Sequence, residues 1–469
     1  SATATTEKKY LKWYQKLAYG SGDLASNCSY GLVSSFVLLY LTGTLGLDSA
    51  IIGSLMLASK VLDGISDVIF GTLIDRTHSK LGKARPWMLF GQVGVSLCLF
   101  LLFAIPAGST TMQYIYFFIV YTALNAVFYT ANGIAYSSLV ALITKNNNER
   151  VQLGSFRFMF AVVTNIFMGF AVTGMVEKFG SGAAGWRTTA LIFAIVGLVV
   201  NTISCLAVKE LPEEELSGNT SEAAEEGKAV AEEKKHGFAE TAKILVHNKY
   251  YLMILAIYIV YYIMSNLTTG AGVFCATYYW GDGSLLGQFS MMKMFPVIIA
   301  LAIAPVLIKK TGSMQKVNFW GYAISSVLGI PMIYFAMQKN LSMFLLFMFI
   351  KGIFAGTLSG SLNALIAEAS GYTTRTTGIH MDGMMYSCSS LGVKVGGGIG
   401  TAAVGWLLKL GGFVGTATVQ SESAIRMIFN LYITFPFVIG IIITVLLAFL
   451  DVEKANKKWD AEHQKEAQA

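Results

Sequence analysis

Long runs of apolar residues alternate with short polar segments along almost the whole chain. The runs reach about twenty residues or more, the length that an α-helix needs to cross the hydrocarbon core of a bilayer. Read with a window of about 19 residues, the pattern predicts twelve membrane-spanning helices. The predicted spans are 17–44, 48–74, 87–107, 112–143, 152–176, 186–208, 250–279, 285–308, 317–337, 342–369, 379–408 and 425–450.

Polar segments divide these spans into two groups of six. We therefore expect an N-terminal six-helix bundle, 17–208, and a C-terminal six-helix bundle, 250–450. The linker between them, 209–249, is rich in glutamate and poor in apolar residues, which is typical of a solvated tether. Its end, Phe238–Val246, has the pattern of a short amphipathic helix. The remaining segments are an N-terminal tail, 1–16, and a C-terminal tail, 451–469.

Lysine and arginine mark one side of the predicted membrane. If the N-terminus is inside, the inner segments carry 24 of the 34 Lys and Arg residues and the outer segments carry five. Cytoplasmic loops are enriched in these residues, so both tails and the linker are predicted to be cytoplasmic. The net charge of +7 then reflects orientation in the bilayer, and no nucleic-acid partner is expected.

The composition excludes several classes of protein. Only 13% of the 469 residues are charged and 54% are hydrophobic, whereas a soluble domain has about 25% charged residues. A soluble enzyme, a secreted scaffold and a nucleic-acid binder are therefore excluded. The five cysteines lie inside apolar runs, and no HExxH, Walker, CxxC or GxSxG motif occurs. We expect no enzyme activity and no cofactor.

An internal repeat supports the two bundles. Gly53–Thr77 and Gly287–Thr311 have the same length, begin with Gly and end with Leu-Ile-x-x-Thr. Parallel repeats of six helices are typical of the major facilitator fold, in which the substrate site lies between the halves near the midplane. The second repeat has apolar residues at the positions of Asp63 and Asp67, so the two halves differ in chemistry at this depth.

Charged residues inside the apolar runs are the main functional candidates. A charge at the bilayer centre costs at least about 2.5–3.5 kcal/mol. Lys293 and Lys351 stand nearer the ends of their spans, and we expect them to extend towards the membrane surface. The other charged positions in the spans require a specific explanation.

Asp63 and Asp67 are four residues apart and so share one face of the second predicted helix, with Lys60 close to that face. Two carboxylates this close repel each other in a low dielectric unless they share a proton or a bound cation. The pair therefore predicts a site for H⁺ or Na⁺, with Asp63 and Asp67 as metal ligands if the ion is Na⁺. The alternative is a structural ladder with Lys60 and neighbouring basic groups.

A second set of polar residues is suited to a sugar. Asp23 and Asn27 lie one turn apart on the first helix, and carboxylate and carboxamide groups bind sugar hydroxyls. Arg157 and Lys394 lie about mid-helix in opposite halves. They either donate hydrogen bonds to a polar substrate or neutralise acids within the bundles.

The loop between the second and third helices is strongly basic. It begins at Asp75-Arg76 and reaches Arg85, near the third span. Together with Lys60, these groups suit a cytoplasmic gate. The ion pairs of such a gate form in one conformation of the transporter and break in the other. The alternative is that they only fix the orientation of the helices in the membrane.

These motifs together resemble the glycoside–pentoside–hexuronide:cation symporter family. The resemblance rests on KVLDGISD at 60–67, DRTHSKLGKARPW at 75–87, YGSGDLASN at 19–27 and VKVG at 393–396, and it extends over nearly the whole chain. It implies a multi-pass transporter of the bacterial inner membrane that imports a sugar together with a cation.

The resemblance also implies roles for particular residues in binding the cation. Asp63 and Asp67 would be ligands, with an oxygen from Thr130 of the fourth helix. Ser66 completes the candidate set, but the family usually has Asn at this position. Loss of the amide ligand favours H⁺ relative to Na⁺.

For the sugar, the resemblance implies that Asn27, Arg157 and Lys394 face the substrate or the coupling network. The sugar-binding acids known in the family fall at Asn27 and at Asn132 or its neighbour Gly133. Because neither acid is present, specificity for an α-galactoside is not implied. Asp23, Asn27, Asn132, Arg157 and Lys394 form the candidate substrate-binding set.

The sequence therefore predicts a secondary active transporter that imports a sugar or glycoside by H⁺ or Na⁺ symport through alternating access. Two alternatives within transport are a carrier of a lipid-like or other amphiphilic solute and a sugar facilitator without coupling. An integral membrane enzyme would need a catalytic cluster, and the sequence contains none. The expected partners are the sugar, a monovalent cation and the lipid bilayer.

Overall fold

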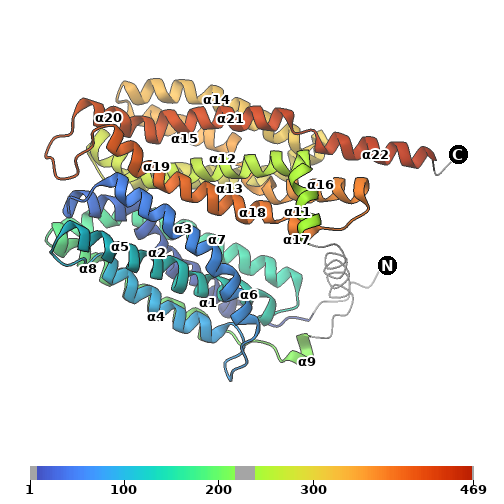
Figure 1. Cartoon of the computed structure of the whole chain (residues 1–469), viewed down its shortest axis with the longest axis horizontal. Helices are drawn as coiled ribbons and strands as arrows, with labels where there is room; N and C mark the ends of the chain where they lie inside the picture. The colour runs from blue at the N-terminus through green and yellow to red at the C-terminus, as the bar shows by residue number, and fades with distance from the viewer. Residues whose placement is uncertain (1–7, 217–237, 467–469) are drawn as a thin grey trace. The chain divides into compact units, whose positions relative to one another are not determined.

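The computed structural model describes residues 8–216 and 238–466, and this part of the chain is built from helices without strands (Figure 1). The predicted all-α membrane fold is confirmed. Residues 1–7, 217–237 and 467–469 lie outside the described residues, so the predicted tether and both tails are described only in part.

The helices of the N-terminal half follow the predicted spans closely. They are α1 (Trp13–Gly20), α2 (Gly22–Leu39), α3 (Ser49–Asp75), α4 (Arg85–Leu102), α5 (Thr110–Thr122), α6 (Thr130–Ile143), α7 (Asn147–Lys178) and α8 (Gly182–Leu206), followed by the short α9 (Glu213–Leu216).

The C-terminal half begins with α11 (Phe238–His247), where a short amphipathic helix was expected. The helices that follow are α12 (Lys249–Phe274), α13 (Leu285–Thr311), α14 (Met314–Met337), α15 (Leu341–Ala355), α16 (Thr357–Thr377), α17 (Asp382–Met385), α18 (Ser387–Leu391), α19 (Gly397–Leu410), α20 (Glu422–Phe429), α21 (Phe435–Phe449) and α22 (Val452–Glu466).

Eleven helical segments among the described residues are long and apolar enough to cross a membrane. The expected span that is not among them is 48–74. It forms one continuous helix, α3, which carries Lys60, Asp63, Asp67 and Asp75. The helix of the predicted second span is therefore present, while its charge distinguishes it from the other spans.

Several spans contain a π-helical turn instead of continuous α-helix. These turns are Tyr40–Thr44, Ala123–Tyr129, Cys275–Tyr279, Gly392–Gly396 and Asn430–Thr434. A π-turn widens the helix and releases a backbone carbonyl from its usual partner, and such turns occur frequently at functional sites. Two of them bear on the candidates, since Thr130 directly follows one turn and Lys394 lies within another.

The helices form two compact units, each with its own core. Among the described residues, the first contains 8–216 with 269–290 and 401–428, and the second contains 238–268, 291–400 and 429–466. In the first unit a core cluster surrounds the stacked rings of Tyr19 and Tyr136. In the second, apolar residues of α12, α16 and α21 pack together. Each unit carries one of the cavities described below.

Candidate functional site

An open cavity of about 480 Å³ lies in the first unit, bordered by α2, α6 and α7. Eight of the ten residues along it carry a hydrogen-bonding side chain, although they come from apolar spans. This volume falls within the range of about 300–1,000 Å³ typical of small-molecule sites. The residues that line it are Asp23, Ser26, Asn27, Tyr129, Gly133, Ile134, Tyr136, Ser137, Ser138 and Arg157.

A break at the start of the first span sets the position of Asp23. The span is divided at Ser21 between α1 and α2, with Gly20 and Gly22 on either side. A Cβ atom at Gly20 would collide with Phe156, and one at Gly22 would collide with the ring of Tyr136. The two glycines therefore allow the close packing that places Asp23 in the first turn of α2 at the cavity wall.

Asp23 and Arg157 form the charged centre of the cavity. Arg157 Nε donates to Asp23 Oδ2 over 2.8 Å, and Nη2 donates to Oδ1 over 3.4 Å. The guanidinium also lies over the ring of Tyr136, 4.1 Å from its centroid. A two-pronged ion pair stacked on an aromatic ring holds both charges in a fixed geometry. Both side chains stay partly exposed to the cavity.

Asn27 lies one turn beyond Asp23, as its spacing predicts. Its Nδ2 donates to the backbone oxygen of Asp23 over 2.7 Å, and its Oδ1 accepts from Nδ2 of Asn165 over 2.9 Å. The carboxamide is therefore oriented from both sides. One N–H and one lone pair of Asn27 remain for a ligand.

Two predicted substrate residues lie elsewhere. Asn132 is buried against Gly91 of α4 and is not among the residues that line the cavity, although its neighbour Gly133 is. Helical geometry explains this, because consecutive residues point in directions about 100° apart. Lys394 belongs to the second unit, in the π-turn Gly392–Gly396.

The predicted cation residues lie at the packing of α3 against α6. Asp63 is buried, and its Oδ1 accepts from Oγ1 of Thr130 over 2.7 Å. Asp67 is half-buried one turn further along α3. The hydroxyl of Ser66 donates to the backbone oxygen of Asp63 over 2.9 Å and so serves its own helix. Thr130 directly follows Tyr129, which lines the cavity.

The carboxylates on α3 are a pair, not a larger cluster. Within the described residues no group of three or more His, Cys, Asp or Glu side chains gathers as metal ligands would. A cation held here would take the two carboxylates together with neutral oxygens such as the hydroxyl of Thr130. A proton needs only one carboxylate and a hydrogen-bond partner.

The predicted gate residues differ in how far they are buried. Arg85 is buried, and its Nε donates to the backbone oxygen of Cys205 over 3.2 Å. Asp75 and Arg76 are exposed at the end of α3, and their side chains form no hydrogen bond or ion pair with other described residues. Lys60 is half-buried on α3. Arg85 is therefore fixed against α8 at the start of α4.

A residue that we did not predict organises this loop. The carboxylate of Glu210 accepts hydrogen bonds from the backbone N–H groups of Lys83, Ala84 and Arg85 over 2.6–3.0 Å. These groups lie at the start of α4, where N–H groups lack partners within the helix. Glu210 is the first acidic residue of the glutamate-rich linker. It anchors the basic loop between α3 and α4.

Sequence reasoning also missed part of the cavity wall. Tyr136 supports Arg157, and its hydroxyl donates to the backbone oxygen of Tyr19 over 2.6 Å. Asn165 orients Asn27 from α7. The available signal was the presence of polar side chains inside α6 and α7, but tyrosine and asparagine in a membrane helix also serve packing.

Gly133 offers a direct test of the cavity. A Cβ atom at this position would meet no atom within 4 Å, so a large side chain has room to extend into the cavity. We expect Gly133→Phe to keep the fold and to reduce solute binding more than tenfold by occupying the space. Gly154→Phe on α7 is the matched control, since a Cβ atom there also meets nothing and Gly154 does not line the cavity.

Binding of labelled solute to purified protein and the thermal unfolding midpoint together check this prediction. Equal binding by the Gly133→Phe and Gly154→Phe proteins would show that the solute does not enter the cavity.

The helical fold and its polar cavity define a membrane transporter of the major facilitator type. The family model described as MFS/sugar transport protein matches residues 18–454. The chain therefore belongs to this family of transporters, which are not enzymes, and the resemblance to the glycoside–pentoside–hexuronide:cation symporters is confirmed.

Curated relatives and a solved structure agree with this assignment. The chain is 26% identical over 466 residues to the "Isoprimeverose transporter" of Lactiplantibacillus pentosus, covering 98% of this chain and 93% of the relative. It is 24% identical over 449 residues to the "Putative glycoside/cation symporter YagG" of Escherichia coli (strain K12), covering 95% and 93%. The solved D-xylose-proton symporter matches with a TM-score of 0.64 at 13% identity, covering 94% and 98%, which is a likeness of fold.

Proposed function

We propose that this secondary sugar transporter imports a sugar or glycoside across the inner membrane of a bacterium by symport with a cation. The observation that carries the proposal is the contact between Asp63 and Thr130, a buried carboxylate on a hydroxyl one residue from the cavity wall. Through this contact, the ionisable carboxylate of Asp63 lies next to the cavity that we propose binds the solute.

The chemistry of the cavity favours a small solute rich in hydroxyl groups. Asp23 and Asn27 supply acceptors, Arg157 supplies donors, and three serines add groups of both kinds. The faces of Tyr129 and Tyr136 can cover the apolar side of a sugar ring. A lipid-like solute would need a long apolar wall, whereas only Ile134 among the ten lining residues is aliphatic.

The hydrogen bonds of Thr130 favour a proton as the coupling ion. Its hydroxyl lies 2.7 Å from Asp63 Oδ1 and 2.8 Å from the backbone oxygen of Asn125, in the preceding π-turn. A hydroxyl has one hydrogen and can donate to only one of these oxygens at a time. When Asp63 is ionised, Thr130 donates to it. When Asp63 is protonated, the acid donates to Thr130, which then donates to Asn125.

Both protonation states of Asp63 are thus accommodated without moving the backbone. Sodium would instead need several oxygens around one point. The family position that usually supplies an amide holds Ser66, whose hydroxyl is engaged with its own helix. For these two reasons we propose H⁺, in preference to Na⁺, as the coupling ion.

We further propose that transport follows alternating access by the two bundles, 17–208 and 250–450, with both termini in the cytoplasm. Loading of the cation on α3 and of the sugar at α2, α6 and α7 would then favour the conformational change together. A sugar facilitator without coupling is the second candidate, because the cavity alone accounts for sugar binding.

Uptake into proteoliposomes tests the proposal. Purified protein is offered a panel of labelled monosaccharides and glycosides while a pH gradient, a Na⁺ gradient or no gradient is imposed. Accumulation of one sugar above its external concentration under one of the gradients is the expected result. Equilibration without accumulation would indicate a facilitator, and uptake of lysolipid in place of any sugar would indicate an amphiphile carrier.

A further inference from the structure

The C-terminal segment, which the sequence predicts only as a tail, forms the helix α22 and packs against α16 of the same unit (Figure 1). Buried and half-buried side chains recur along α22 at Val452, Asn456, Trp459 and Asp460, whereas Lys458 is exposed. Spacings of three and four residues place the buried side chains on one face of a helix. The helix α22 is therefore docked on the second unit by that face.

Polar groups make up much of this docked face. The carboxylate of Glu453 accepts from the backbone N–H of Gln315, at the start of α14, over 3.1 Å. Nδ2 of Asn456 donates to the backbone oxygen of Glu368 on α16 over 3.0 Å and to its carboxylate over 2.8 Å. The helix α22 thus joins α14 to α16.

An ion pair fastens α22 to the last turn of α16. Nε of Arg375 donates to Oδ1 of Asp460 over 2.8 Å, and Nη2 donates to Oδ2 over 3.1 Å. A two-pronged pair of this kind fixes the geometry of both side chains. Three residues beyond Arg375, α16 ends at Gly378, which has a left-handed φ of 71°. The pair therefore holds α16 just before the helix ends.

The chain becomes irregular directly after α16, although the sequence predicts a continuous span over 379–408. The short helices α17 and α18 are separated by a turn at Tyr386, and the π-turn 392–396, which contains Lys394, follows before α19 begins. Breaks of this kind interrupt the hydrogen bonding of a helix, and helices bend at them. The first part of the predicted span is therefore suited to bend.

The far end of this irregular segment is held by close packing on α12. A Cβ atom at Gly392 would collide with the side chain of Tyr258, and one at Gly396 would collide with the backbone oxygen of Ile259. The two glycines allow this close approach. With α16 fastened on one side and the π-turn packed on the other, bending is confined to 378–391.

We propose that α22 is a strap that keeps the end of α16 fixed, so that 378–391 serves as a hinge in the second unit during transport. A hinge moves one helix relative to another only when each side of it is attached to a rigid part. The strap and the hinge belong to the second unit alone, whereas their role in transport rests on the proposed function.

Hydrogen exchange of backbone amides, measured on the full-length protein in lipid nanodiscs, tests the strap and the hinge without any solute. In the wild type, amides of 378–391 should exchange faster than those of α16 and α19. Asp460→Asn and Arg375→Met should each speed exchange in α22 and in the last turn of α16 about fivefold, the upper end of the range for a partly exposed ion pair. The double variant should match either single variant, because the pair acts as one unit.

Glu462→Gln is the matched control. It removes a carboxylate from an exposed position of the same helix, where Glu462 pairs with Lys458 of α22 itself, and should exchange like the wild type. Asp460→Glu keeps the carboxylate and should also stay close to the wild type. Equal exchange in Asp460→Asn and Glu462→Gln would overturn the strap. Exchange in 378–391 as slow as in α16 and α19 would overturn the hinge.

The rate of transport separates a strap from a helix that serves stability alone. The probe is the labelled sugar that the wild type accumulates most in the uptake panel. Asp460→Asn should slow its counterflow about fivefold and leave its affinity unchanged, because the proposed sugar cavity belongs to the first unit. Added potassium chloride should slow the wild type and Asp460→Glu but not Asp460→Asn, since salt screens exposed ion pairs.

Counterflow by Asp460→Asn at the wild-type rate would overturn the role of the strap in transport. Failure of every sugar of the panel to enter would instead contradict the proposed function. Hydrogen exchange would then still decide whether the second unit contains the strap and the hinge.

Discussion

Replacing Asp63 with Asn is expected to abolish accumulation of sugar against its gradient while exchange of sugar across the membrane continues. The carboxamide has nearly the shape of the protonated acid, and its N–H group can donate to Thr130, 2.7 Å away in the wild type. It cannot release a proton. The variant therefore mimics the cation-loaded carrier permanently, so sugar still crosses but the cation gradient no longer drives it.

The expected effect is large. One monovalent cation moving down 100 mV supplies about 2.3 kcal/mol, and each 1.4 kcal/mol corresponds to a tenfold ratio of concentrations. Wild-type protein should therefore accumulate a neutral sugar roughly fortyfold, whereas Asp63→Asn should only equilibrate it. Uptake in proteoliposomes with an imposed potential, together with counterflow without a gradient, measures both parts.

Glu177→Gln supplies the control for this variant. It also removes one carboxylate, but from an exposed position at the end of α7, and it should accumulate sugar normally. If Asp63→Asn accumulated sugar as well as Glu177→Gln, the acids on α3 would be structural. Loss of counterflow together with accumulation would instead assign Asp63 to sugar binding or folding.

The sequence was sufficient to predict the helices because the apolar runs and the polar loops differ so strongly. The sequence was also sufficient to predict that Asp23 and Asn27 lie on the same helical face, because they are four residues apart. Both residues line the cavity. It could not show that Asp23 and Arg157 meet, because they are 134 positions apart. Only packing of α2 against α7 brings them together.

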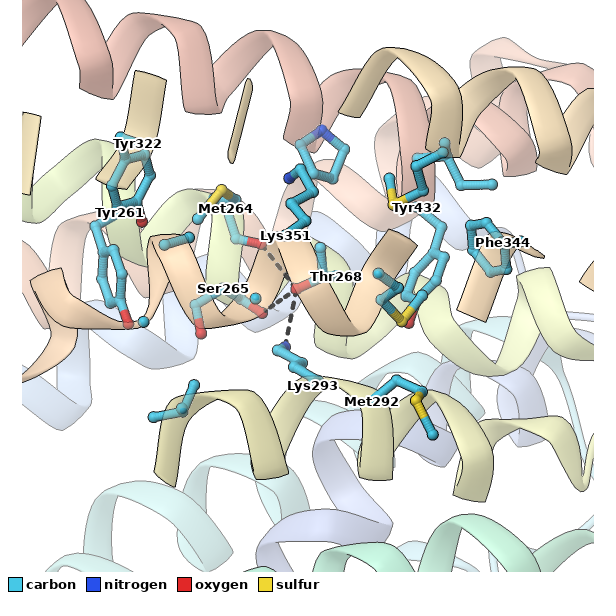
Figure 2. Close-up of a pocket in the computed structure, with 18 residues that line it drawn as sticks. Tyr261, Met264, Ser265, Thr268, Met292, Lys293, Tyr322, Phe344, Lys351 and Tyr432 are labelled. Atoms are coloured by element: carbon cyan, nitrogen blue, oxygen red, sulfur yellow. Dashed lines mark hydrogen bonds between the residues drawn. The ribbon is translucent and has the colours of Figure 1, made fainter. Parts of the chain in front are cut away.

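Other features escaped prediction for a different physical reason. The π-turn before Thr130 and the one around Lys394 shift the helical register by a single residue, which a periodicity of 3.6 does not reveal. The direction of Asn132 away from the cavity follows from such local register. For Lys293 and Lys351, the position in the predicted spans did not show that both side chains border one cavity of the second unit, with Lys293 exposed and Lys351 half-buried (Figure 2).

Replacing Arg157 with Met is expected to lower sugar affinity at least tenfold and to destabilise the protein at the same time. The change removes both hydrogen bonds to Asp23 and the stacking on Tyr136. It also leaves the carboxylate of Asp23 without its cation. Truncating one partner of a buried charge pair costs about 2–5 kcal/mol, and the partial exposure of this pair to the cavity places it near the lower end of that range.

The double variant Asp23→Asn with Arg157→Met separates the structural effect from the functional one. Removing both charges eliminates the unpaired carboxylate, so the thermal unfolding midpoint should recover most of its loss. Sugar affinity should stay low, because the donors of the guanidinium and the acceptors of the carboxylate are both missing from the cavity. Arg157→Lys should fall between, since a lysine keeps the charge but lacks the planar group that bonds Asp23 twice and lies flat on a ring. Normal sugar binding by the double variant would show that this pair holds α2 and α7 together and that the substrate is recognised by other groups.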